Sequence, residues 1–157
     1  MNELPGQIVT LLQSGQPREI VLEKVLRETL KQFHSDTGTI HRLHETTQLL
    51  RLIAQVGLPP QLLDMVTIIP VGKGIAGQVI AQNKPVSICN LQTDSSGIAK
   101  PGAKQTGVGG ALCVPIRNGD KTVGTIGIGT IRQHEYTPDE TRELEEIGRL
   151  IGRELKL

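Results

Sequence analysis

The stretch ALCVPIRNGDKTVGTIGIGTI occupies residues 111–131 and indicates the fold class. Two apolar runs, 111–117 and 122–131, flank the tripeptide Asn118-Gly119-Asp120. An Asn-Gly pair accepts the positive φ angles of a tight hairpin turn, so these runs are expected to form two adjacent antiparallel strands. The stretch therefore predicts a sheet that is mainly antiparallel.

The segment that follows this hairpin begins with a capping box. Thr137 is the expected N-cap, Pro138 fits the first helical position, and Glu140 can return a hydrogen bond to the backbone of Thr137. An apolar stripe follows at helical spacing, formed by Leu144, Ile147, Ile151 and Leu155. We expect one long amphipathic helix to the end of the sequence.

Two helices are predicted before the first strand. Residues 8–12 have helical spacing and stop at Ser14-Gly15, which predicts a short helix. A stronger pattern starts at Pro17, and its apolar stripe runs from Val21 to Phe33 on one face. The other face of this second helix carries charged side chains and is expected to contact solvent.

The middle of the chain alternates between short extended runs and one helix. Residues 38–44 and 48–55 predict a hairpin, and residues 66–71 predict a third strand. A short helix is expected from Gly74 to Gln82, then a strand over 86–89 and a long loop over 91–109. Helices at both ends with such a sheet between them predict a layered α/β (α+β) domain.

Length and composition exclude several classes of protein. The 157 residues suit a single domain. The formal net charge of +1 provides no basic surface for direct nucleic-acid binding. No apolar run reaches the roughly 20 residues that span a bilayer, and the acidic start differs from a signal peptide, so we expect a cytoplasmic protein without membrane contact. The two cysteines suit reduced thiols.

Several phrases occur in an order and spacing that resemble the GAF domain family. They are IAQVGLP at 53–59, IPVGKGIAGQV at 69–79, GALCVPI at 110–116 and TVGTIGI at 122–128. The resemblance covers residues 17–157, and residues 1–16 add an N-terminal helix. The chain is thus expected to be one GAF-like domain over residues 1–157.

The resemblance implies a central antiparallel sheet with the terminal helices on one face. A ligand pocket is implied on the other face, under the helix 74–82 and the loop 91–109. The residues expected to line it are Ile75, Val79, Cys89, Asp94 and Cys113. GAF-like domains bind cyclic nucleotides, bilins, haem, anions or metabolites, so the fold does not name the ligand.

The function expected from this resemblance is that of a non-catalytic sensory module. It would bind an unidentified small molecule and signal its presence, and a separate output protein could read that state. No cofactor is predicted. The four histidines include no metal-binding motif, and His41 and His44 point to opposite faces of one strand.

Three specific ligand types each have a simpler explanation of the same residues. Gly72, Gly74 and Gly77 could present N–H groups to an anion, although turn formation explains the same glycines. A bilin is disfavoured because neither cysteine precedes a histidine. Cyclic nucleotide stays an option on the fragments Asn83-Lys84 and Tyr136 to Glu140, the second of which the capping box already explains.

The enzymatic alternative is an activity like that of free methionine-(R)-sulfoxide reductase. Those small GAF enzymes place one cysteine in the glycine-rich phrase and another in the long loop. Here Ala76 occupies the first place, and the loop 91–109 contains no cysteine. Cys89 and Cys113 have the same strand parity, so a thiol switch between them was considered as a weaker option.

The remaining alternative is a ligand-free dimerisation scaffold. Gly148 and Gly152 lie four residues apart on the last helix, where each costs about 0.5–1 kcal/mol relative to alanine. They could allow close approach of the same helix from a second copy, or of another part of this chain. Whether or not the domain binds a ligand, we expect a homodimer formed through the terminal helices, because the resemblance implies that GAF-like domains often dimerise there.

Overall fold

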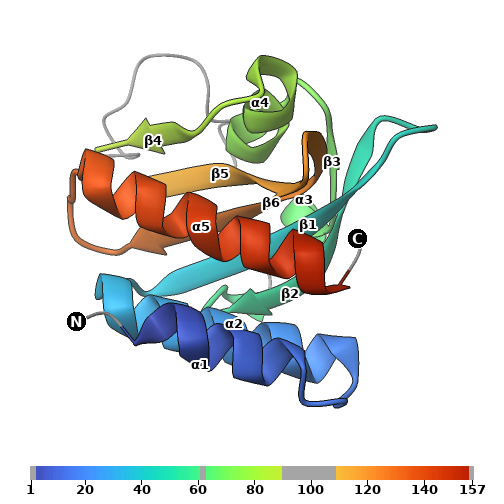
Figure 1. Ribbon diagram of the computed structural model, residues 1–157. Coiled ribbons are helices and arrows are strands. Elements are labelled where there is room, and N and C mark those ends of the chain that lie inside the picture. Colours follow the sequence, from blue (N-terminus) through green and yellow to red (C-terminus); the bar gives the residue numbers. More distant parts are fainter. Residues whose placement is uncertain (1–2, 61–62, 90–108, 156–157) are drawn as a thin grey trace.

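The computed structural model describes residues 3–60, 63–89 and 109–155, and Figure 1 shows how their elements are arranged. In chain order the elements are α1 (Leu4–Leu12), α2 (Arg18–Phe33), β1 (Thr37–His44), β2 (Leu49–Val56), α3 (Leu63–Thr67), β3 (Ile68–Pro70), α4 (Gly74–Gln82), β4 (Val86–Ile88), β5 (Gly110–Asn118), β6 (Lys121–Thr130) and α5 (Pro138–Leu155).

The strands form one six-stranded sheet in the order β3-β2-β1-β6-β5-β4. Every pair of neighbours is antiparallel, which confirms the predicted sheet. Helix α5 packs on β5, α2 packs on β1 and β2, and α1 lies against both helices. Figure 1 shows these three helices, in blue and red, on one side of the sheet. Helices α3 and α4 contact the sheet from the other side.

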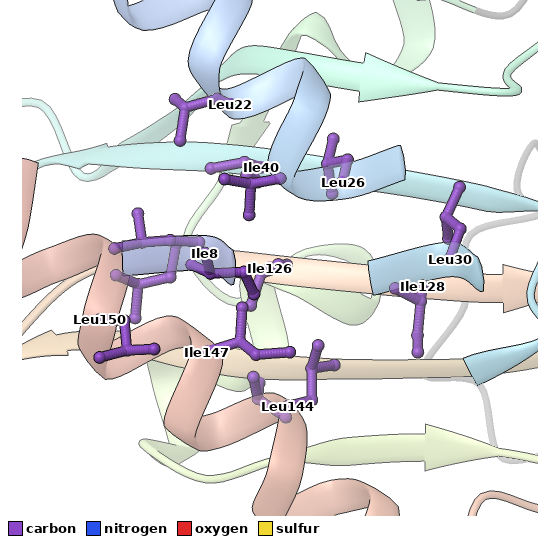
Figure 2. Close-up of a cluster of buried hydrophobic side chains, with 14 of the residues drawn as sticks. Ile8, Leu22, Leu26, Leu30, Ile40, Ile126, Ile128, Leu144, Ile147 and Leu150 are labelled. Atoms are coloured by element: carbon purple, nitrogen blue, oxygen red, sulfur yellow. The ribbon is translucent and has the colours of Figure 1, made fainter. Parts of the chain in front are cut away.

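The main core lies between the sheet and the three terminal helices. Ile40, Ile126 and Val114 face each other in register on β1, β6 and β5, and all are 0% exposed. Figure 2 shows Ile40 and Ile126 meeting side chains such as Leu26 and Ile147 from the helices. Full burial of such a side chain contributes about 1.5–3 kcal/mol, so this aliphatic layer stabilises the fold.

The capping box at the start of α5 is confirmed. The backbone N–H of Glu140 donates to Thr137 Oγ1 at 3.1 Å, and the N–H of Thr137 donates to Glu140 Oε1 at 2.9 Å. Among the described residues, no helix is both long enough and apolar enough to cross a membrane.

Two local expectations were wrong. Val66 and Thr67 belong to the one-turn helix α3 and not to a strand, so only residues 68–70 pair with β2. Short apolar runs do not distinguish a strand from a helical turn. In the β5–β6 hairpin, Asn118 pairs with Lys121, so Gly119 and Asp120 form the turn. Gly119 has φ +64°, as the first central residue of a type II′ turn requires.

The glycines of α5 face the sheet of their own chain. A Cβ at Gly148 would lie 3.1 Å from the Pro115 carbonyl oxygen, and one at Gly152 would lie 2.4 Å from that of Arg117. Both glycines are buried. They allow α5 to approach β5 closely, so the reason given for a homodimer through these residues was wrong, and the homodimer stays a prediction without that support.

Candidate ligand-binding face

The candidate site is the sheet face that the terminal helices leave uncovered. Side chains of directly opposed residues point to the same face, so the register defines rows across the strands. One row runs from Val86 through Cys113 and Gly127 to Thr39. The next row runs through Pro115, Thr125 and His41. These two rows bring together residues from four strands.

Helix α4 covers one end of this face with an apolar contact. Val79 packs with Val86 and Cys113, and Ile75 and Ala76 pack against them at the edge. Val79 is 0% exposed, whereas Ile75 is half-buried. Three of the residues expected to line a pocket, Ile75, Val79 and Cys113, therefore lie together, and Asp94 falls outside the described residues.

Cys89 lies apart from this group. The register places Val86 opposite Cys113, so Cys89, three residues later, has the opposite parity. Its side chain is exposed, and its sulfur accepts a hydrogen bond from Gln133 Nε2 at 3.4 Å. The expectation that the two cysteines share one face was wrong.

His41 is a polar side chain buried on this face, with 2% of its surface exposed. Its Nε2 lies 2.7 Å from the carbonyl oxygen of Val66 in α3. A carbonyl only accepts hydrogen bonds, so Nε2 carries the proton and Nδ1 is an acceptor in the neutral ring. Burial lowers the pKa of His41 below its usual 6.5, against a smaller opposing effect of the Val66 hydrogen bond. The neutral form is thereby favoured.

Two polar atoms on this face lack hydrogen-bond partners among the described residues: His41 Nδ1 and Thr125 Oγ1. Thr125 is 0% exposed and is the direct cross-strand neighbour of His41. The Thr125 hydroxyl lies near the Cys113 thiol and lowers the pKa of that thiol, whereas burial raises it. The contact does not have the geometry of a hydrogen bond, so the hydroxyl counts as unpaired. Leaving a buried polar group unsatisfied costs about 1–3 kcal/mol, which marks this pair as unusual.

Gly127 lies between the polar pair and the apolar cluster. A Cβ at this position would lie 3.3 Å from Thr39 Oγ1 and 3.5 Å from Cys113 Sγ. Gly127 is partly exposed, whereas its neighbours Ile126 and Ile128 are buried. The backbone of β6 is therefore accessible here, flanked by one hydroxyl and one thiol.

The Cys113 thiol is protonated at neutral pH. Burial raises its pKa to about 12, and the Thr125 hydroxyl and the Val114 backbone only partly oppose this effect. The thiolate is the nucleophile and the metal ligand, so this cysteine is a poor nucleophile at neutral pH. The described residues contain no group of three or more His, Cys, Asp or Glu side chains placed to hold a metal ion.

Sequence reasoning missed Thr39 and Thr125 and considered His41 only as a metal ligand. The strand register is the information that identifies these residues as neighbours on one face. Once Cys113 is assigned to the uncovered face, Gly127 and Thr39 follow from the pairing of β5 with β6 and of β6 with β1. Thr125 and His41 occupy the next row on the same face.

Comparison with known proteins gives a family and a fold. The family model described as GAF domain matches residues 15–156. No curated protein matches the chain significantly. Similar solved structures include free methionine-R-sulfoxide reductase from Neisseria meningitidis in complex with its substrate, with 15% identity, TM-score 0.80, and coverage of 98% of this chain and 87% of that one.

Two further similar structures are described as GAF domains. The domain from a Coxiella burnetii phosphoenolpyruvate-protein phosphotransferase has 16% identity, TM-score 0.82, and coverage of 98% of this chain and 91% of that one. The A. aeolicus nlh2 GAF domain, in an inactive state, has 22% identity, TM-score 0.77, and coverage of 98% and 94%. At these identities the likeness concerns the fold, and that fold occurs both in an enzyme and in structures described only as GAF domains.

Proposed function

Because this chain belongs to the GAF domain family, we propose that it is a non-catalytic sensory module that binds a small molecule on the uncovered sheet face. The ligand would lie over Gly127, beside the apolar cluster around Val79, and it would reach the buried polar pair His41 and Thr125 by displacing the side chains that cover them. Its occupancy would be relayed to an output protein. Ile75, Val79 and Cys113 are proposed as residues of this site, and Asp94 stays a prediction.

The unsatisfied polar pair is the observation that carries this proposal. Valine has nearly the same shape as threonine and would fill the position of Thr125 without a hydroxyl that lacks a partner. A hydroxyl and an imidazole acceptor side by side suit a ligand with a hydrogen-bond donor, such as an amide or a hydroxyl group. We therefore propose a small, largely neutral molecule with one polar edge.

The thiol chemistry argues against a reductase. Cys113 is buried with a pKa of about 12, and Cys89 is exposed with the opposite strand parity. Ala76 occupies the place in the glycine-rich phrase where those enzymes have a cysteine, and it packs against the apolar cluster. A thiol pair that attacks and then resolves needs a second thiol within reach. We propose no turnover, and rapid reduction of free methionine sulfoxide by the purified protein would contradict this.

The test of ligand binding has two steps. Native mass spectrometry of the purified protein looks for a co-purified molecule, and a thermal-shift screen of metabolites follows. A ligand at 100 times its Kd stabilises the folded state by about 2.7 kcal/mol, so true ligands should raise the melting temperature measurably.

The site is tested with matched threonine variants. Thr125→Val should abolish the ligand-induced shift, whereas Thr29→Val should keep it. Thr29 is also 0% exposed, but it lies on α2 and its hydroxyl donates to the Val25 carbonyl at 2.7 Å. Ligand-dependent hydrogen-exchange protection should appear in α4, β5 and β6. Protection confined to α1 and α2 would refute the site.

A further inference from the structure

Arg117 contacts elements on both faces of the sheet. Its Nη2 donates to the carbonyl oxygen of Asn83 at 2.9 Å and to Asn83 Oδ1 at 3.1 Å. Its Nη1 lies 3.7 Å from Glu145 Oε2 in α5. Asn83 caps the end of α4, on the uncovered face, whereas α5 lies on the opposite face. One side chain thus joins two helices that the sheet separates.

The edge of the sheet makes this reach possible. β4 pairs with residues 111–113 of β5, and within the described part of the chain no strand pairs with that side of β5 from Val114 onward. Arg117 has the same parity as Cys113 and therefore starts on the uncovered face. The pairing shifts after Ile116, where β6 contains the extra residue Val123, so the bulge brings Thr122 opposite Arg117. The guanidinium extends around the open edge of β5.

The contacts at the α4 end are specific. Asn83 has the left-handed φ of +54°, a conformation in which asparagine is favoured over most residues. Thr122, the cross-strand partner of Arg117, donates its hydroxyl to the same Asn83 Oδ1 at 2.9 Å. The amide oxygen of Asn83 therefore has two donors from the hairpin β5–β6. Displacement of the end of α4 would break both bonds.

The contacts at the α5 end are also close. The side chains of Arg117 and Glu145 are 23% and 19% exposed, so their ion pair is partly shielded from water. The backbone carbonyl of Arg117 also lies where a Cβ on Gly152 would be 2.4 Å away. Backbone and side chain of this one residue thus both contact α5.

We propose that Arg117 is a positioning residue that transmits displacement of α4 to α5 around the edge of β5. As a regulatory device this link rests on the proposed function, because a ligand over Gly127 would act on α4 through Val79 and its neighbours. The mechanical link itself exists without a ligand and can be tested on the protein alone.

The test perturbs α4 and measures α5 by amide hydrogen exchange. Val79→Ala removes part of the apolar contact between α4 and β5. Exchange in α5 should rise by about two- to fivefold relative to α2, as expected for contacts coupled through shared partners. Helix α2 packs on α1, β1 and β2 and therefore reports global destabilisation. Gln78→Ala, which removes a 2.8 Å bond to the Gly72 carbonyl, replaces Val79→Ala if that variant fails to fold.

The decisive measurement repeats this perturbation without the link. Arg117→Met removes the contacts of this side chain with both Asn83 and Glu145. Asn83→Gly removes the amide contact at the end of α4 and keeps the left-handed backbone conformation. In both backgrounds the relative response of α5 should disappear, while exchange in α4 still rises. In the control Arg149→Met, which removes an ion pair with Glu146 within α5, the response should persist.

The link through Arg117 is refuted if hydrogen exchange in α5 does not rise when α4 is perturbed. It is also refuted if exchange in α5 rises equally without the Arg117 or Asn83 side chain, or if the Arg149→Met control also abolishes the rise. None of these results would bear on ligand binding, which is measured separately by mass spectrometry and thermal shift.

Discussion

Gly148→Ala and Gly152→Ala should have opposite effects on stability, although they are the same change one helical turn apart. Alanine favours a helix over glycine by about 0.5–1 kcal/mol at each position. At Gly148 the new Cβ would lie 3.1 Å from the Pro115 carbonyl oxygen and 3.5 Å from Ile116 Cα. A shift of a few tenths of an ångström relieves this contact. The free energy of unfolding should therefore stay unchanged or rise by up to about 0.5 kcal/mol.

At Gly152 the clash outweighs the gain in helix propensity. The Cβ would lie 2.4 Å from the Arg117 carbonyl oxygen and 2.9 Å from its carbon. These are backbone atoms of a paired strand, so α5 must move away by roughly 1 Å to reach van der Waals distance. Overpacking of this kind costs about 1–3 kcal/mol. After subtraction of the propensity gain, the free energy of unfolding should fall by about 0.5–2 kcal/mol.

Urea denaturation followed by circular dichroism at 222 nm measures both changes, since the chain has no tryptophan. Unchanged m-values would show that the effect lies in stability and not in the denatured state. Equal stabilisation by both variants would refute the close approach of α5 to β5. Sedimentation of the parent protein would then have to test again whether the glycines face a second copy.

Three further predictions concern single side chains. Thr137→Ala should lower the free energy of unfolding by about 1 kcal/mol because the capping box is lost, and Thr137→Ser should largely restore it in urea denaturation. Burial lowers the pKa of His41 from 6.5, so the unfolded chain binds a proton that the folded chain excludes. The free energy of unfolding should therefore decrease as the pH drops from about 6.5 towards 5. In urea denaturation at each pH, His41→Gln should make this decrease smaller. Iodoacetamide should modify Cys89 but not Cys113 in the folded protein, and it should modify both cysteines after unfolding. Mass spectrometry after mild peroxide should show no disulfide between Cys89 and Cys113. A quantitative disulfide would contradict the opposite strand parity of the two cysteines.

Much of the fold could be predicted because its signals are local. The capping box of Thr137 and the hairpin around Gly119 each depend on a few neighbouring residues. The prediction failed at residues 66–67, where a short β-branched run continues a helical turn. Thr67 Oγ1 donates to the Leu63 carbonyl at 2.7 Å, which stabilises that turn. Periodicity over so few residues cannot detect such a bond.

The candidate site was harder to predict because it depends on register. The uncovered face is set by the pairing of β1 with β6, which joins His41 to Thr125 across most of the chain. The alternation of side chains within one strand does not tell which residue of another strand lies opposite. Cys89 shows the same limit, since its comparison with Cys113 assumed a strand register that the sequence does not supply; the observed pairing of Val86 with Cys113 gives Cys89 the opposite parity. Val79 was identified because the family resemblance, and not periodicity, placed α4 over the sheet.

The two faces of the sheet differ in a way that separates a sensor from a scaffold. On the helix-covered face, α5 fits closely against β5 at Gly152 and Arg117, and the buried side chains are mostly aliphatic. On the other face, Thr125 and His41 are buried without full hydrogen bonding, at a cost of about 1–3 kcal/mol for each unsatisfied atom. A scaffold gains nothing from that cost, because an apolar residue of the same shape would be more stable. A binding module recovers it when a ligand supplies the missing partners, which is why we propose a sensor and not a ligand-free scaffold.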